Sequence, residues 1–186
     1  MSREDGRYYV QLWPHELYQR LEEEYPEGSS LYHVGGEEFP LFEVGSGDIV
    51  ILAAESEKIG APPFIVAAIE VGRLCEADEA RAVLGASLSP FGDVRHQLLA
   101  RRSSPLVFDR RMPEGIQAEE ISQSATHAHT GTVMSVDPAL ASTLLSMLAP
   151  LADTELAAYP EVCRNHDTFL SENGDIAESG DPDGIF

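Results

Sequence analysis

The alternation of apolar and polar residues along the chain predicts several short strands and a few helices. Residues 7–13 (RYYVQLW) are rich in aromatic and β-branched residues, as strands are. Pro14 then opens a helix in which leucines and tyrosines share one face and glutamates the other. The apolar runs at 49–54 and 64–74 are typical of buried strands.

The rest of the chain continues this mixture without a regular βαβ alternation. Residues 94–100 (VRHQLLA) fit either a strand or a helix. Helices are expected at 76–85, from Pro138 onward and at 153–163, and further strands at 31–34, 39–44, 105–109 and 129–136. This pattern favours an α+β fold with a small curved sheet or barrel and flanking helices.

The chain of 186 residues fits a single domain over 1–165, followed by an acidic, Gly- and Asp-rich tail over 166–186 that we expect to be disordered. We see no apolar run near the roughly 18 residues of a membrane span and no export signal. Cys75 and Cys163 stand far apart without a CxxC partner. The simplest interpretation is that both are free thiols in a reducing compartment, so we expect a cytoplasmic protein.

Acidic residues dominate the charge of the chain. There are 32 Asp and Glu residues against 12 Lys and Arg, a formal net charge of −20, and Lys58 is the only lysine. Such a surface repels polyanions and attracts basic partners. Acid excess with few lysines also suits a proteome adapted to high salt, although a GC-rich genome depletes lysine as well.

Five of the few cations gather in one short stretch that contains a single acid, Asp109. They are Arg95, Arg101, Arg102, Arg110 and Arg111. This stretch can form an anion-binding face. Bidentate hydrogen bonds from arginine act at short range, whereas the repulsion of an anion by the acidic surface acts over longer distances and is screened by salt. The alternative is that these arginines neutralise nearby acids. Since adjacent strand residues face opposite sides, one arginine of each pair is expected to point away.

The segment 45–74, a turn GSGD, an apolar strand, a loop and FIVAAIEVGRL, resembles the central hairpin of PUA-like domains of the EVE and ASCH type. RYYVQLW resembles their aromatic first strand, and residues 129–148 resemble their closing strand and helix. The resemblance implies binding of DNA or RNA, including a modified base held in a pocket of the curved sheet. For Gly47 and Asp48 the local alternative is a turn capped by the aspartate.

A base-binding pocket needs an aromatic platform and polar groups for the base edge. Trp13, the only tryptophan, is the candidate stacking wall, with a core position as the alternative. Further pocket candidates are Tyr32, His127 and His129. The two histidines face one side of a strand, but no third ligand has a diagnostic spacing, so we expect no metal site.

Two other functions stay open. An immunity or inhibitor protein that covers a basic protein partner fits the net charge directly. A small amidohydrolase of modified nucleosides, which the ASCH resemblance implies, would use Lys58. No nucleophile elbow, zinc-protease, P-loop or Rossmann motif occurs. We therefore assign no catalytic residue and no cofactor, and expect a binding protein that does not act at membranes.

Overall fold

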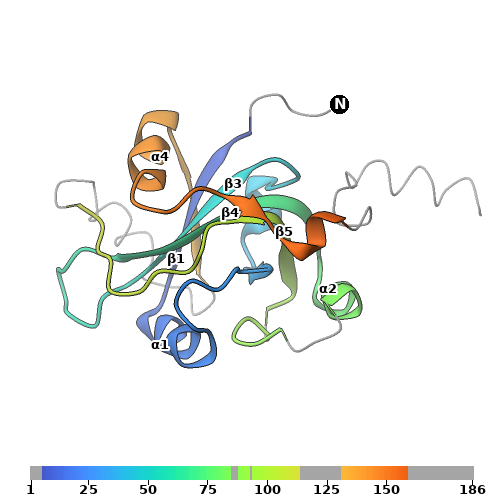
Figure 1. The fold of residues 1–186 in the computed structure, drawn as a ribbon, viewed down its shortest axis with the longest axis horizontal. Coiled ribbons are helices and arrows are strands. Elements are labelled where there is room, and N and C mark those ends of the chain that lie inside the picture. The colour runs from blue at the N-terminus through green and yellow to red at the C-terminus, as the bar shows by residue number, and fades with distance from the viewer. Residues whose placement is uncertain (1–5, 85–87, 93, 114–130, 159–186) are drawn as a thin grey trace, which may run out of the picture.

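The protein has an α+β fold in which one mixed β-sheet is flanked by helices (Figure 1). The computed structural model describes residues 6–84, 88–92, 94–113 and 131–158. Within these ranges the helices are α1 (His15–Glu24), α2 (Ala77–Leu84) and α4 (Pro138–Leu145), with 3-10 turns η1 (Phe39–Phe42) and η2 (Glu155–Ala158). The strands are β1 (Tyr8–Trp13), β2 (His33–Gly35), β3 (Ile49–Ala54), β4 (Phe64–Glu76), β5 (His96–Ser103), β6 (Thr132–Val136) and β7 (Ala152–Asp153).

The sheet runs in the order β2-β5-β4-β3-β1-β6. Only β1 and β3 are parallel, and the other neighbours pair antiparallel. The edge of β5 that faces away from β4 has two partners. β2 pairs with residues 97–99 of β5, and the short strand β7 pairs with its last two residues. β5 therefore carries two different neighbours along one edge.

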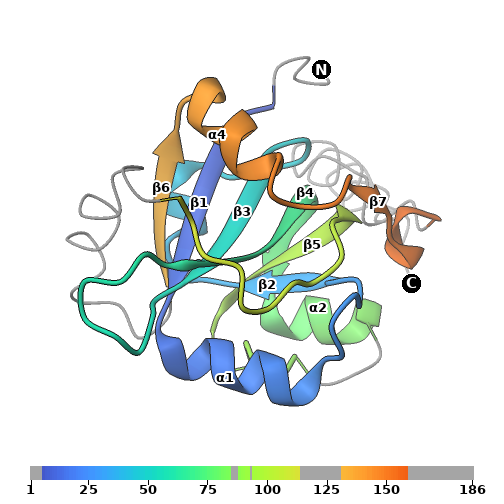
Figure 2. The same cartoon turned by 60° about the vertical axis from the view of Figure 1, so that its left-hand side comes forward.

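Two apolar layers cover the two faces of the sheet, with α1 and α4 on opposite sides (Figure 2). Because strand residues alternate, Tyr9 and Trp13 enter the layer beneath α1, whereas Val10 and Leu12 pack beneath α4. Burial of each such side chain contributes about 1.5–3 kcal/mol to folding. The helices close the layers through Tyr18 and Leu21 of α1, and Ala141 and Leu144 of α4.

The sheet is open, yet it coils until its two ends meet through side chains. Gln11 of β1 donates from Nε2 to the carbonyl of Gly35 in β2, at 2.9 Å, across the interior of the coil. Glu38, just after β2, accepts from the backbone N–H of Val133 in the edge strand β6. The α+β prediction with a small curved sheet is thus consistent with the fold, but no strand pairing closes a barrel within the described residues.

Three local predictions are resolved by tertiary contacts. Residues 39–44 do not form a strand, because Phe39–Phe42 form a 3-10 turn with Pro40 near its start, and Glu43 follows it with φ of 52°. Residues 94–100 resolve as the start of β5. Residues 105–109 form no ladder strand, although an isolated bridge at Pro105 holds the segment.

The turn at 45–48 confirms the capping interpretation of its aspartate. Asp48 is buried, and its carboxylate accepts from the backbone N–H groups of Arg7, at 3.0 Å, and Gly45, at 2.9 Å. The Arg7 guanidinium adds a third contact of 3.1 Å. Asp48 therefore connects the residue before β1 to the turn before β3.

Among the helices in the described ranges, none has the length and apolar character needed to cross a membrane. The described ranges all belong to the proposed domain 1–165, and the predicted tail at 166–186 lies outside them.

Candidate anion-binding site at a bulge in strand β5

The arginine-rich stretch runs along the whole length of β4 instead of gathering at one point. Arg111 forms an isolated bridge with the first residue of β4. Arg102 pairs with Glu70 in the middle of the strand. Arg95 contacts Glu76 at its end, with a nitrogen–oxygen distance of 2.8 Å. At about 3.3 Å per residue, successive arginine positions lie about 20 Å apart, so the expectation of one convergent arginine face is wrong.

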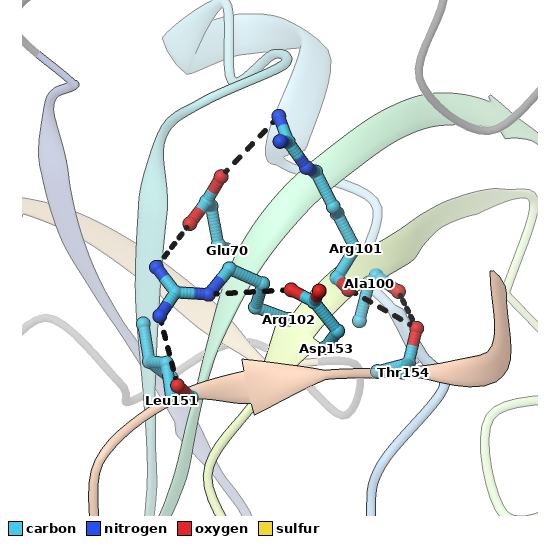
Figure 3. Close-up of polar contacts among 7 residues, drawn as sticks. All are labelled: Glu70, Ala100, Arg101, Arg102, Leu151, Asp153 and Thr154. Atoms are coloured by element: carbon cyan, nitrogen blue, oxygen red, sulfur yellow. Dashed lines mark hydrogen bonds and ion pairs between the residues drawn. The ribbon is translucent and has the colours of Figure 1, made fainter. Parts of the chain in front are cut away.

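A β-bulge turns two adjacent arginines toward the same carboxylate. Glu70 pairs with Arg102 and Val71 pairs with Ala100, which leaves Arg101 as an extra residue on β5. A bulge sets two residues against one and breaks the strict alternation of side chains. Arg101 and Arg102 accordingly both form ion pairs with Glu70 (Figure 3). The expectation that one arginine of this pair points away is therefore wrong.

Arg102 is the anchored member of the pair. Its Nη1 donates to Glu70 Oε2 at 3.2 Å and its Nη2 donates to the carbonyl of Leu151 at 2.9 Å. Its Nε lies 3.7 Å from Oδ1 of Asp153, the β7 residue beside it in the ladder. Three acceptors from two chain segments thus hold this guanidinium in place.

Thr154, directly after β7, satisfies the carbonyl groups that the bulge leaves outside the regular ladder. Its hydroxyl donates to the carbonyl of Ala100 at 2.7 Å and lies 3.2 Å from the carbonyl of Arg101 (Figure 3). Its backbone N–H also donates to the carbonyl of Arg101, at 3.0 Å. Because the hydroxyl is buried, losing it would leave a carbonyl without a partner inside the protein. Thr154 therefore stabilises the bulge that sets the direction of the two arginines.

Arg101 is the weakly held member. Among the described residues its one ion pair is with Glu70, at 3.8 Å, and its side chain is 51% exposed. Exposed ion pairs at such distances contribute little to stability. The Arg101 guanidinium can therefore leave Glu70 for an incoming anion, while Arg102 keeps Glu70 neutralised.

The two arginines lie at one end of a row of side chains that crosses the sheet. Tyr8 pairs with Ile49, Ile49 with Glu70, and Glu70 with Arg102, so all four point to the face that carries α4. Tyr8 is half-buried, and three strand spacings of about 4.8 Å place it about 14 Å from Arg102. An aromatic ring and an arginine pair therefore share one sheet face.

The second arginine pair has a structural role. Arg110 donates to the carbonyl of Met147. Arg111 donates to Ser56 Oγ at 3.0 Å, and its guanidinium lies 4.3 Å from the ring centre of Phe64. The cation–π contact and the hydrogen bonds of Arg111 to Ser56 and to the carbonyl of Pro62 hold the 55–63 loop to the start of β4.

Arg95 is an exposed surface cation. Its hydrogen bond and charge lower the pKa of the Glu76 carboxyl and raise the pKa of the guanidinium itself. Both side chains are more than half exposed, so salt screens this pair. The neutralising interpretation describes Arg95 better than an anion-binding one.

The aromatic wall predicted at Trp13 is wrong in this structure. Trp13 is 0% exposed, and its ring centre lies 4.7 Å from that of Phe91 in the core. A base cannot stack on a ring that the protein already covers on all sides. Tyr32 is half-buried and packs against the core cluster around Cys75. His127 and His129 lie outside the described residues.

Three features of the described residues bear on the enzyme alternative. They include no group of three metal-ligating side chains. Lys58 lies exposed in the 55–63 loop. Burial raises the pKa of the Cys75 thiol to about 11, so this cysteine stays protonated near neutral pH and is a poor nucleophile.

The sequence interpretation missed three residues of the bulge site: Glu70, Asp153 and Thr154. Glu70 had a signal, because it is the one charged residue between Phe64 and Gly72 in an otherwise apolar strand. Asp153 and Thr154 had none, because only the β5–β7 pairing brings them to Arg102.

Comparison of the chain with known proteins gave no match to a family model, to a curated protein or to a solved structure. The bulge site is therefore interpreted from its own geometry.

Proposed function

We propose that the protein is a binding module that takes a phosphate group of a nucleic acid at the Arg101–Arg102–Glu70 cluster. The observation that carries this proposal is the bulge, which points two adjacent arginines to one face. Bulges commonly re-aim side chains next to functional sites. The resemblance to PUA-like domains of the EVE and ASCH type supports the same class of ligand and belongs to this proposal.

The two arginines have different roles in binding. Arg102 keeps its contacts with Glu70, Asp153 and the Leu151 carbonyl, so it supplies a fixed positive charge. Arg101 swings from Glu70 to the phosphate, where a guanidinium can donate two parallel hydrogen bonds. Tyr8, in the same cross-sheet row, offers a partly exposed ring to a neighbouring base.

The spacing of the arginines limits the contact to about one phosphate. A protein that neutralises one phosphate has a slope of log K against log salt of about −0.7 to −0.9, whereas five contacts would give about −4. A chain of net charge −20 also repels the remaining phosphates, and added salt screens this repulsion, which offsets part of the loss of affinity. Hence the proposed ligand contact is local and weakly dependent on salt.

Fluorescence anisotropy with labelled single-stranded DNA and RNA, methylated and unmethylated, tests this proposal between 0.1 and 1 M salt. We expect Arg101→Gln to weaken binding about tenfold or more, since a charge-assisted hydrogen bond contributes about 1.5–3 kcal/mol. Arg95→Gln is the matched control, because it makes the same change in net charge at an exposed arginine at the other end of β5. Equal effects of the two variants, or a slope near −4, would refute the local phosphate contact.

A second function is favoured by the pairing of the cations. Each of the nine arginines in the described ranges donates to, or pairs with, a carboxylate, carbonyl or hydroxyl group. The uncompensated surface charge is thus negative, and α1 exposes Glu16, Glu22 and Glu23. Such a surface steers a basic protein partner.

Affinity capture at 0.1 M salt followed by cross-linking tests this second function. A basic partner should cross-link near α1 and dissociate in 1 M NaCl. The double variant Glu22→Lys, Glu23→Lys should lose it, whereas Glu155→Lys, at an exposed residue of η2, which packs against β5, should keep it. If the α1 double variant captures the partner as well as the unchanged protein does, α1 is not the surface that binds it.

A further inference from the structure

Glu70 occupies the position at which an anion would contact both arginines of the bulge (Figure 3). Its Oε1 lies 3.8 Å from Nη1 of Arg101, and its Oε2 accepts from Nη1 of Arg102 at 3.2 Å. It stands in β4 between the buried residues Ile69 and Val71, and its side chain is 16% exposed. This carboxylate therefore competes with any anion that approaches the two guanidinium groups.

This competition sets how much charge a ligand must carry in order to bind. Arg101 and Arg102 each carry one positive charge and Glu70 one negative charge, so the cluster has a small net positive charge. An internal phosphodiester carries the same single charge as the carboxylate that it displaces from Arg101, so the exchange gains little. A terminal phosphate monoester carries a charge of about −1.5 to −2 at pH 7, so its attraction to the cluster is about twice as strong.

The two sides of the cluster differ in charge across the sheet. On the outer side of β5, Asp153 pairs with Arg102 in the ladder and is 78% exposed, and Glu155 is exposed two residues later. On the opposite side, the cross-sheet row continues through the aliphatic Ile49 and the aromatic Tyr8. Phosphates on the β7 side would face two carboxylates, which repel a nucleic acid that continues in both directions. A chain end avoids this repulsion, because it continues in one direction only.

We propose that the Arg101–Arg102–Glu70 cluster binds a terminal phosphate monoester of a nucleic acid, and that Glu70 disfavours internal phosphodiesters. This inference rests on the phosphate contact proposed above and narrows its ligand to a chain end. In the bound state, the Arg101 guanidinium turns from Glu70 to the phosphate, while Arg102 keeps its contact with Glu70. The nucleic acid then runs from the cluster past Ile49 toward Tyr8.

Three forms of one single-stranded oligonucleotide test this preference by fluorescence anisotropy, with the label at the 3′-end. Their 5′-ends carry a hydroxyl, a phosphate or a methylphosphate, and the methyl ester keeps the position of the phosphate but holds a single charge. We expect the phosphate form to bind at least about tenfold more tightly than the other two. The same three groups at the 3′-end, with the label at the 5′-end, are measured in parallel, and this preference at either end supports the proposal.

The variant Glu70→Gln tests the competition directly, because it keeps the shape of the side chain and an acceptor for Arg102 but removes the charge. It should strengthen binding of the hydroxyl-ended probe about tenfold, and a residue with a merely structural role would not produce such a gain. Arg101→Gln should abolish the preference for the terminal phosphate. The matched control is Glu76→Gln, which makes the same charge change at the exposed end of β4, where Glu76 pairs with Arg95, and should change binding less than about twofold.

The outcomes separate this inference from the phosphate contact on which it rests. Equal affinities for the three end groups, all weakened by Arg101→Gln, would overturn the end preference and leave the phosphate contact in place. Absence of binding, or binding that Arg101→Gln does not change, would overturn both. Weaker binding by a folded Glu70→Gln would show that this carboxylate supports the anion instead of competing with it. If Glu70→Gln fails to fold, Asp153→Asn removes the other acid beside Arg102, and an affinity for the hydroxyl-ended probe that does not rise would count against the proposal.

Discussion

Glycine positions differ in what surrounds them, even where their backbone conformation is the same. Gly28 and Gly131 both have φ of 88°. A Cβ at Gly28 would meet no atom within 4 Å, whereas one at Gly131 would meet the Trp13 and Gln11 side chains below 3 Å. Alanine substitutions at these two glycines therefore separate the free-energy cost of a left-handed backbone from the cost of side-chain crowding.

We expect Gly28→Ala to destabilise the fold by about 1–2 kcal/mol, the cost of placing an alanine in the left-handed region. Gly131→Ala should cost at least about 2 kcal/mol more, because overpacking adds to the same backbone term. Urea unfolding followed by circular dichroism measures both values. Equal losses for the two variants would mean that the Gln11–Trp13 region is not tightly packed.

His33 makes stability depend on pH. Its ring is buried and its Nδ1–H donates to Gln97 Oε1, and burial lowers its pKa below the unfolded value of 6.5. Below pH 6.5 the unfolded state therefore binds a proton that the folded state excludes, so stability falls as the pH falls.

The slope expected from this residue is up to about 1.4 kcal/mol per pH unit between pH 6.5 and the lowered folded pKa. His33→Asn keeps a donor near the Nδ1 position but cannot titrate, so the unfolding free energy should vary less between pH 7 and 5. His96→Gln, at the half-buried start of β5, serves as the control. An unchanged slope in His33→Asn would assign the pH dependence to other groups.

At the scale of elements, the pairing of β5 with β7 decides the geometry of the arginine pair. β7 has only two residues, too few to be recognised from composition. Its neighbour Thr154 nevertheless satisfies the carbonyls at the bulge. The predicted strands 49–54 and 64–74 are confirmed. A long apolar run is stable only when it is buried, so the sequence alone was sufficient to place these two strands in the sheet.

Thr154→Val should destabilise the protein by about 1–3 kcal/mol, because it keeps the shape of the side chain but leaves the Ala100 carbonyl without its hydroxyl partner. Thr143→Val on the exposed face of α4 is the control and should change stability by no more than about 0.5 kcal/mol. Thermal unfolding measures both. If Thr154→Val is as mild as Thr143→Val, the bulge does not depend on this hydroxyl.

At the scale of the whole molecule, the net charge of −20 outweighs the local arginine pairs. Within the described ranges, the ion pair that an acid of α1 forms is that of Glu24 with Arg20, at 3.9 Å. Repulsion among such charges destabilises the compact state. Salt relieves it, because the screening length falls from about 10 Å at 0.1 M to about 3 Å at 1 M.

We therefore expect the Tm to rise by at least about 3 °C between 0.1 and 1 M NaCl, since about 1 kcal/mol corresponds to 2–4 °C for a chain of this size. Differential scanning calorimetry measures the shift, with sucrose of equal osmolality as the control for excluded solutes. A Tm that is flat or falls with NaCl would show that the exposed acids do not limit stability.

By itself, the sequence determined the α+β class, the long central strands, the helix after Pro14 and the acidic character, because these follow from local periodicity and composition. Tertiary structure decided the destination of each candidate side chain. Trp13 lies in the core and Arg95 on the surface, while Arg101 and Arg102 both contact Glu70. A bulge shifts register by one residue, and that shift arises from pairing between distant strands, which no local pattern contains.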